Sequence, residues 1–94
     1  MPVGMLVLHI LLPGCTSLKE KRSRLKPLLA RLHREFNISV AEIDLQDAWQ
    51  ESVIACAMVS NDSRFNQRAL QDIASWLERH RPDVSLVDQK IEII

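Results

Sequence analysis

The start of the sequence changes from a strand pattern to a helix pattern within a few residues, and this change constrains the fold more than any other feature. Residues Val3 to Leu12 form a short apolar run rich in β-favouring side chains, and Pro13-Gly14 closes the run with a turn. Ser17 and Glu20 then form an S-x-x-E capping box, which predicts that a helix begins at Ser17. The chain therefore opens as a strand followed directly by a helix.

This first helix is predicted to end at Asn37, a residue that tolerates the left-handed conformation of a helix stop. Pro27 falls on its solvent side, where it removes one helix hydrogen bond, so a break between Ser23 and Pro27 is the main alternative to one continuous helix. The apolar positions recur on one face at helical spacing, and they are Leu18, Leu25, Leu28, Leu29, Leu32 and Phe36.

The remaining segments predict strand, strand, helix, strand. Residues 38–45 alternate apolar and polar side chains, as an edge strand does, whereas residues 53–59 are apolar on both sides, as a central strand is. Residues 61–63 supply caps for a second helix that Pro82 ends, and residues 84–94 form the last strand. The inner face of the second helix is predicted to carry Phe65, Ala69, Leu70, Ile73, Trp76 and Leu77. This order predicts an α+β, ferredoxin-like βαββαβ sandwich, with a four-stranded antiparallel sheet and both helices on one face.

Length and composition narrow the class of protein. The 94 residues fit one domain spanning 1–94, and 12 basic against 12 acidic residues give no net charge that would favour nucleic acid or membrane. The run from Met5 to Leu12 is far too short to span a membrane. Two cysteines without a metal-binding spacing predict no metal or cofactor and a reducing, cytoplasmic setting.

The neutral total conceals a basic first helix, which holds seven Lys and Arg residues against two Glu. One interpretation is that these cations contact the phosphates of RNA or of the ribosome. The alternative is that they pair with the acidic strand and turn that follow, at Glu42, Asp44, Asp47 and Glu51. The candidate phosphate-contacting residues are Lys19, Lys21, Arg22, Arg24, Lys26, Arg31 and Arg34.

Two helices cover one face of the sheet, so the other face is predicted to be open. Met5, Val7, His9 and Leu11 point to that face and form an apolar patch, which favours a protein partner or a homodimer over partial cover by the chain ends. Trp49, in the turn after the second strand, either packs as a lid on the sheet edge or contacts a partner.

No motif for catalysis is present, and a non-enzymatic role is expected. Cys15 is predicted to be an incidental surface thiol, Cys56 a core thiol and His9 a residue of the sheet face. The first and third strands hold no aromatic residue, which excludes the base stacking that RRM domains perform on those strands.

Several segments resemble the YlxP-like family, small bacterial proteins of unknown function. They are Leu12-Pro13-Gly14, the SLKEKR block at 17–22, Phe36 to Glu42, Gln46-Asp47 with Trp49-Gln50, and Val59 to Asp62. The resemblance extends over essentially the whole chain. It implies a ferredoxin-like fold, a bacterial cytoplasmic setting and a position among genes for translation and ribosome maturation. It implies no catalytic residue, cofactor or substrate.

Overall fold

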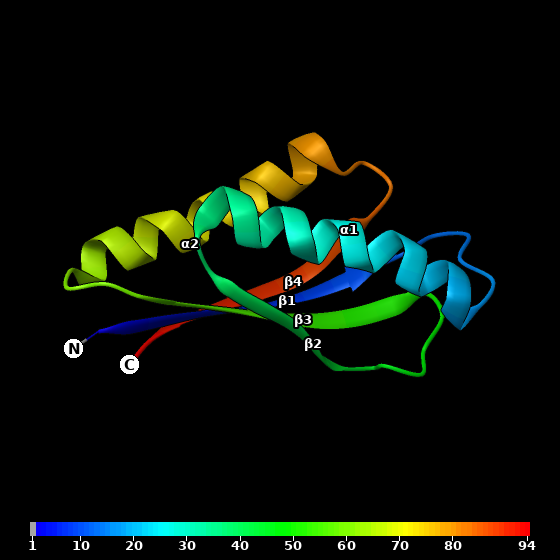
Figure 1. Ribbon diagram of the computed structural model, residues 1–94, viewed down its shortest axis with the longest axis horizontal. Coiled ribbons are helices and arrows are strands. Elements are labelled where there is room, and N and C mark those ends of the chain that lie inside the picture. Colours follow the sequence, from blue (N-terminus) through cyan, green and yellow to red (C-terminus); the bar gives the residue numbers. More distant parts are fainter. Residues whose placement is uncertain (1) are drawn as a thin grey trace.

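The computed structural model describes residues 2–94 and has the element order β1-α1-β2-β3-α2-β4 (Figure 1). The strands are β1 (Val3–Leu11), β2 (Ser39–Asp44), β3 (Glu51–Val59) and β4 (Ser85–Ile93), and the helices are α1 (Leu18–Phe36) and α2 (Ser63–His80). The strands form one sheet in the order β2-β3-β1-β4, and every neighbouring pair is antiparallel. The predicted ferredoxin-like fold is confirmed, with β2 at an edge and β3 inside.

The core lies between the sheet and the two helices, which cover the same face of the sheet in Figure 1. Alternate residues of β1 have no exposed surface, because they point from the centre of the sheet toward the helices. The fully buried apolar residues of β1, α1 and α2 are Leu6, Leu8, Ile10, Leu28, Leu32, Leu70, Ile73 and Leu77. The strand parity predicted from the sequence is therefore confirmed.

Helix α1 is capped nearly as predicted. The Ser17 hydroxyl accepts a 3.0 Å hydrogen bond from the Glu20 amide, and Asn37 ends the helix in the left-handed conformation at φ 49°. In a capping box the Glu20 carboxylate would accept from the amide of Ser17, the cap residue. Here it accepts from the Thr16 amide at 2.9 Å, and this bond lowers the pKa of Glu20. The helix passes through the exposed Pro27, so the predicted continuous helix is confirmed and the alternative of a break between Ser23 and Pro27 is wrong. Neither helix within residues 2–94 is long and apolar enough to cross a membrane.

Candidate nucleic-acid interface

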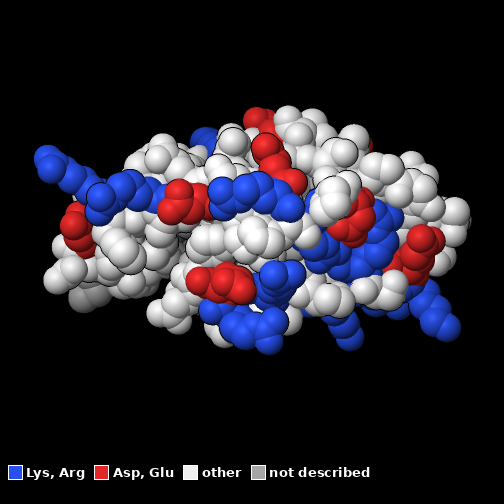
Figure 2. All heavy atoms as spheres, turned by 90° about the horizontal axis from the view of Figure 1, so that it is seen from above, with Lys and Arg blue, Asp and Glu red and all other residues white. Residues whose placement is uncertain are grey.

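Charge is divided between the two layers of the molecule. The helices carry ten Lys and Arg residues against four Asp and Glu, a net charge of +6, whereas the strands and loops carry two against eight. Figure 2 shows the helical side, where Lys and Arg side chains are distributed along the molecule with acidic side chains between them. The neutral chain is therefore dipolar, and its helical side attracts anions.

Four cations of α1 are free to contact a ligand. Lys19, Arg22, Lys26 and Arg34 are exposed, and within residues 2–94 none of their side chains makes a hydrogen bond or an ion pair. The first three recur at intervals of three and four residues, so they form a row along one side of the helix. We call Lys19, Arg22 and Lys26 the cation row. This part of the predicted phosphate-contacting set is available for that role.

Lys21 is not available, and its predicted contact with phosphates is wrong. Its side chain is only 2% exposed, and its ammonium donates hydrogen bonds to the carbonyls of Leu45 (2.7 Å) and Ala48 (2.6 Å). The same Nζ lies 2.9 Å from Oε2 of Glu42. An ammonium has three protons, and these three partners use them all. Within residues 2–94, this is the one ion pair between α1 and the acidic segment at 42–51, so the predicted alternative of extensive pairing is wrong as well.

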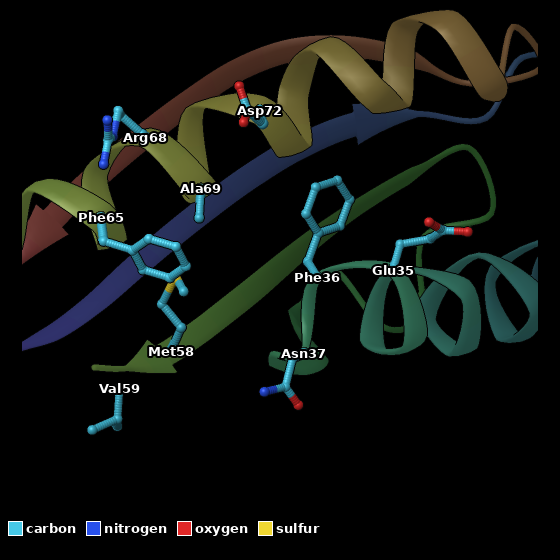
Figure 3. A pocket seen from close by; sticks show the side chains of 9 residues that line it. All are labelled: Glu35, Phe36, Asn37, Met58, Val59, Phe65, Arg68, Ala69 and Asp72. Carbon is cyan, nitrogen blue, oxygen red and sulfur yellow. The ribbon is translucent and has the colours of Figure 1, made fainter. Parts of the chain in front are cut away.

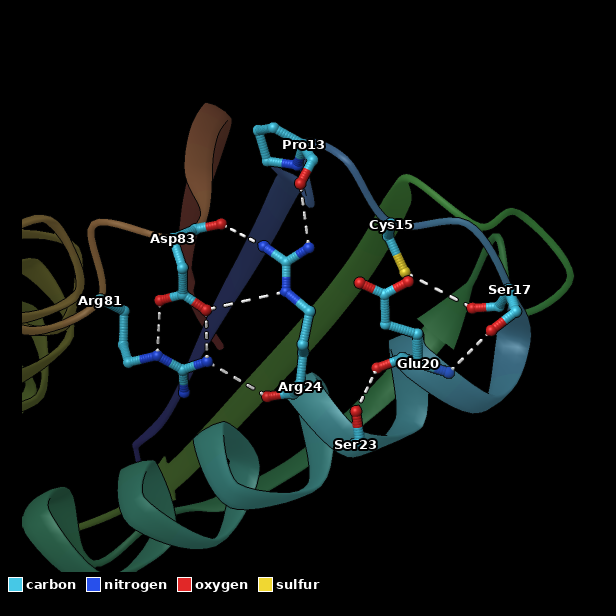
Figure 4. Close-up of polar contacts among 8 residues, drawn as sticks. All are labelled: Pro13, Cys15, Ser17, Glu20, Ser23, Arg24, Arg81 and Asp83. Carbon is cyan, nitrogen blue, oxygen red and sulfur yellow. Dashed lines mark hydrogen bonds and ion pairs between the residues drawn. The ribbon is translucent and has the colours of Figure 1, made fainter.

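Arg24 is also held inside the fold, in a cluster that joins α1 to two loops (Figure 4). Its guanidinium donates to the backbone carbonyls of Pro13 (3.0 Å) and Asp83. Arg81 donates two 2.9 Å hydrogen bonds to the Asp83 carboxylate and a third, at 3.2 Å, to the carbonyl of Arg24. These bonds from Arg81 hold the pKa of Asp83 below its usual value of 3.8. Arg24 therefore positions the loops and is not a free phosphate contact.

The Asp83 cluster predicts a pH dependence of stability. An Asp83→Asn variant is expected to lose about 0.5 kcal/mol of unfolding free energy at pH 7, the range of partly exposed pairs. Because the pKa of Asp83 is lower in the folded chain than in the unfolded one, its contribution is complete above about pH 4 and is lost as the pH falls below that value. Urea unfolding at pH 7 and at pH 3 checks this. A gap between the two proteins that stays the same at both pH values would contradict it.

Arg31 is engaged at the contact between the helices. Its guanidinium carbon lies 5.1 Å from the ring centroid of Trp76, and its Nε is 4.0 Å from a Glu35 carboxylate oxygen. The Trp76 ring also meets Phe36 edge-on at 5.9 Å and stacks on His80 at 4.9 Å. Arg31 is therefore a structural contact of Trp76 through a cation–π interaction.

The sheet face opposite the helices is open. Met5, Val7, His9 and Leu11 point to this side and are half-buried by their neighbours in the sheet. The C-terminal Ile94 exchanges backbone hydrogen bonds with Val3, which extends the pairing of β1 and β4, so the chain end does not fold across this face. The C-terminus therefore does not provide the partial cover that was the alternative to a partner interface.

Trp49 is 53% exposed in the connection between β2 and β3. A lid on the sheet edge would lose most of its exposure, so the packing interpretation of this residue is wrong. A partner contact stays a prediction.

The sequence comparisons identify the family. Residues 3–91 match the profile of a family described as "Protein of unknown function (DUF503)". The chain belongs to the DUF503 family. It is also similar to the uncharacterized protein YlxP of Bacillus subtilis strain 168, with 39% identity over 62 residues that cover 66% of this chain and 67% of that protein. The predicted resemblance to YlxP-like proteins is thereby confirmed.

The DUF503 chain also has a groove that the sequence did not reveal (Figure 3). It has a volume of about 550 Å³ and lies beyond the end of α1, between Phe36 and Phe65, over Met58 of β3. Phe65 was predicted to lie on the inner face of the second helix, but it is 51% exposed. It shares a flank of α2 with Trp76, and α1 ends at Phe36 without reaching it. The remaining lining residues are Glu35, Asn37, Val59, Arg68, Ala69 and Asp72.

The candidate reactive side chains of this DUF503 protein lie on opposite sides of the sheet. Cys15 is fully buried in the core and donates a hydrogen bond to the Ser17 carbonyl, so its prediction as a surface thiol is wrong. Cys56 is a core thiol as predicted, and burial raises its pKa to about 12. His9 lies on the open face, where its Nε2 is 3.9 Å from a Glu51 carboxylate oxygen.

Proposed function

We propose that this protein is an RNA-binding domain that contacts the phosphate backbone through the cation row and Arg34. One observation carries the proposal. These cations are exposed and unpaired within residues 2–94, whereas Lys21, Arg24 and Arg31 of the same helix are used inside the fold. Lys and Arg contacts to phosphates supply most of the sequence-independent affinity for nucleic acids.

The geometry favours binding across the helical side. The four cations are exposed on a helix that covers the sheet, in the layer that carries a net charge of +6. The open sheet face has no aromatic residue on β1 or β3 and therefore no platform for stacking bases. The resemblance to proteins encoded among translation and ribosome-maturation genes supports a ribosomal RNA as the ligand.

The test compares two variants with the same change in net charge. The first reverses the cation row (Lys19→Glu, Arg22→Glu, Lys26→Glu), and the second reverses three exposed cations elsewhere (Arg64→Glu, Arg79→Glu, Lys90→Glu). Fluorescence anisotropy with a labelled RNA stem–loop measures the affinity of each protein. We expect the first variant to bind about 100-fold more weakly than the unmodified protein, and the second to lose about fivefold or less.

Two results would overturn the proposal. Equal losses in both variants would show a general effect of net charge without a role for α1. Failure of the unmodified protein to bind the stem–loop at low salt would remove RNA as the ligand. Circular dichroism of both variants checks that the fold is intact.

The open sheet face supports a second candidate function, which is self-association with another copy of this chain. Met5, Val7 and Leu11 leave an apolar strip uncovered along β1, and such strips commonly mark interfaces. Along one side of the strip, β4 presents Asp88, Lys90 and Glu92, which alternate in sign. Two copies related by a two-fold axis can place a lysine of one opposite a carboxylate of the other, so the face is compatible with itself.

A Val7→Glu variant tests this candidate, because it puts a carboxylate at the centre of the apolar strip. We expect the unmodified protein to form dimers at high concentration and the variant to be monomeric, as measured by light scattering after size-exclusion chromatography. An unmodified protein that is a strict monomer at high concentration would exclude self-association.

A further inference from the structure

Trp49 differs from the other tryptophan because its side chain is not packed in the core. Trp76 is 7% exposed and contacts Phe36, His80 and Arg31. Trp49 is 53% exposed, and within residues 2–94 it makes no aromatic or cation–π contact. An exposed indole on a surface is a large, flat group suited to contact with a ligand.

The backbone on both sides of Trp49 is fixed. Before it, Lys21 bonds the carbonyls of Leu45 and Ala48, and the Ala48 amide donates to the Leu45 carbonyl at 3.0 Å. After it, the Gln50 carbonyl accepts from the Leu12 amide at 2.8 Å, and the Gln50 side chain donates to the Cys15 carbonyl at 3.2 Å. Trp49 therefore stands on an anchored loop.

The loop is anchored by a buried lysine, and burying a charged group costs free energy. Burying a lysine ammonium removes its hydration, and only good partners compensate for that loss. Here the partners are Glu42 and two carbonyls of a loop that contributes no buried residue between Leu45 and Gln50. The arrangement holds the loop in one position. An aromatic group that is already ordered loses less conformational entropy when a ligand binds.

The anchored loop is held against the N-terminal part of α1, which also carries the cation row. The Nζ of Lys21 is 2.6 Å from the carbonyl of Ala48, which precedes Trp49. Lys19 and Arg22 belong to the same turns of α1 but lie on its exposed side. Figure 1 shows the β2–β3 connection at the end of the molecule where α1 begins. The loop itself carries Asp47, which repels phosphates, so the part of a nucleic acid that suits the indole is an uncharged base.

We propose that Trp49 stacks on an unpaired nucleobase of the RNA whose phosphates lie on the cation row. The inference rests on the proposed function and makes it more specific. The preferred ligand is RNA with at least one base outside a duplex, because a paired base has no free face to offer.

The experiment uses a Trp76→Phe protein, in which Trp49 is the one remaining tryptophan. Two unlabelled RNAs are added, a stem–loop with unpaired adenines and a blunt duplex of the same stem sequence, and the emission of Trp49 is recorded. We expect the stem–loop to quench this emission and the duplex to leave it nearly unchanged. In parallel, Trp49→Ala is expected to weaken binding of the stem–loop by about 5- to 100-fold and to leave duplex binding unaffected.

A Trp49→Phe variant is the matched control, since a phenyl ring still stacks and is expected to retain most of the affinity. Two failures are distinguishable. If both RNAs bind in a manner that depends on the cation row, yet Trp49→Ala binds the stem–loop as well as the unmodified protein does, stacking is overturned and the proposed function stands. If neither RNA binds, or if binding ignores the cation row, the proposed function itself fails.

Discussion

A Lys21→Met variant is expected to lose about 3 kcal/mol of unfolding free energy, because removing one partner of a buried ion pair leaves the other groups unsatisfied. Methionine has a similar length and fills the space of the lysine stem. It cannot donate, so Glu42 loses its ion pair and the carbonyls of Leu45 and Ala48 lose their donor. The β2–β3 loop is the region that should loosen first.

Urea unfolding followed by circular dichroism measures this loss. Lys19→Met is the matched control, because Lys19 is exposed and unpaired within residues 2–94 and is expected to change stability by less than about 0.5 kcal/mol. A Lys21→Met protein as stable as the control would contradict the assignment of Lys21 as a buried, fully bonded lysine.

The second large effect is expected at Trp76. Trp76→Ala should cost about 3 to 4 kcal/mol, the range for removing a buried aromatic side chain. Trp76 is 7% exposed and receives both Phe36 and Arg31 from α1, so its loss also separates the two helices. Widening of this contact would displace the C-terminal end of α1.

The exposed tryptophan provides the comparison for this prediction. Trp49→Ala removes the same side chain from a surface loop and is expected to cost less than about 1 kcal/mol. Thermal or urea unfolding of both variants gives the difference directly. Equal losses at the two positions would contradict the described burial of Trp76.

Features set by local sequence were predictable. The burial of Leu6, Leu8 and Ile10 follows from the two-residue period of a strand. The start of α1 at Ser17 and its end at Asn37 follow from capping, which depends on side chains within a few residues of each helix end. These signals do not depend on how distant segments pack.

Features set by distant contacts were not predictable in this way. Helical spacing places Lys21 four and seven residues before Leu25 and Leu28, on the apolar face, but the sequence does not show which groups bind its ammonium. Those partners include carbonyls 24 and 27 residues away. Phe65 and Trp76 share a flank of α2, but only the length of α1 decides that Phe36 covers Trp76 and leaves Phe65 exposed. Cys15 follows a turn in the sequence, yet its side chain joins the core. Lys21 in particular changes the candidate site. It was predicted to contact phosphates, but in the structure it holds the loop that carries Trp49.

The dependence of RNA affinity on salt tests the central claim most directly. The unmodified protein and a neutralised variant (Lys19→Gln, Arg22→Gln, Lys26→Gln) are titrated with the stem–loop from about 50 to about 300 mM KCl, because each phosphate contact releases counterions. If the cation row contacts phosphates, the slope of log affinity against log salt is shallower by about 2 to 3 in the variant. Identical slopes for the two proteins would contradict the account.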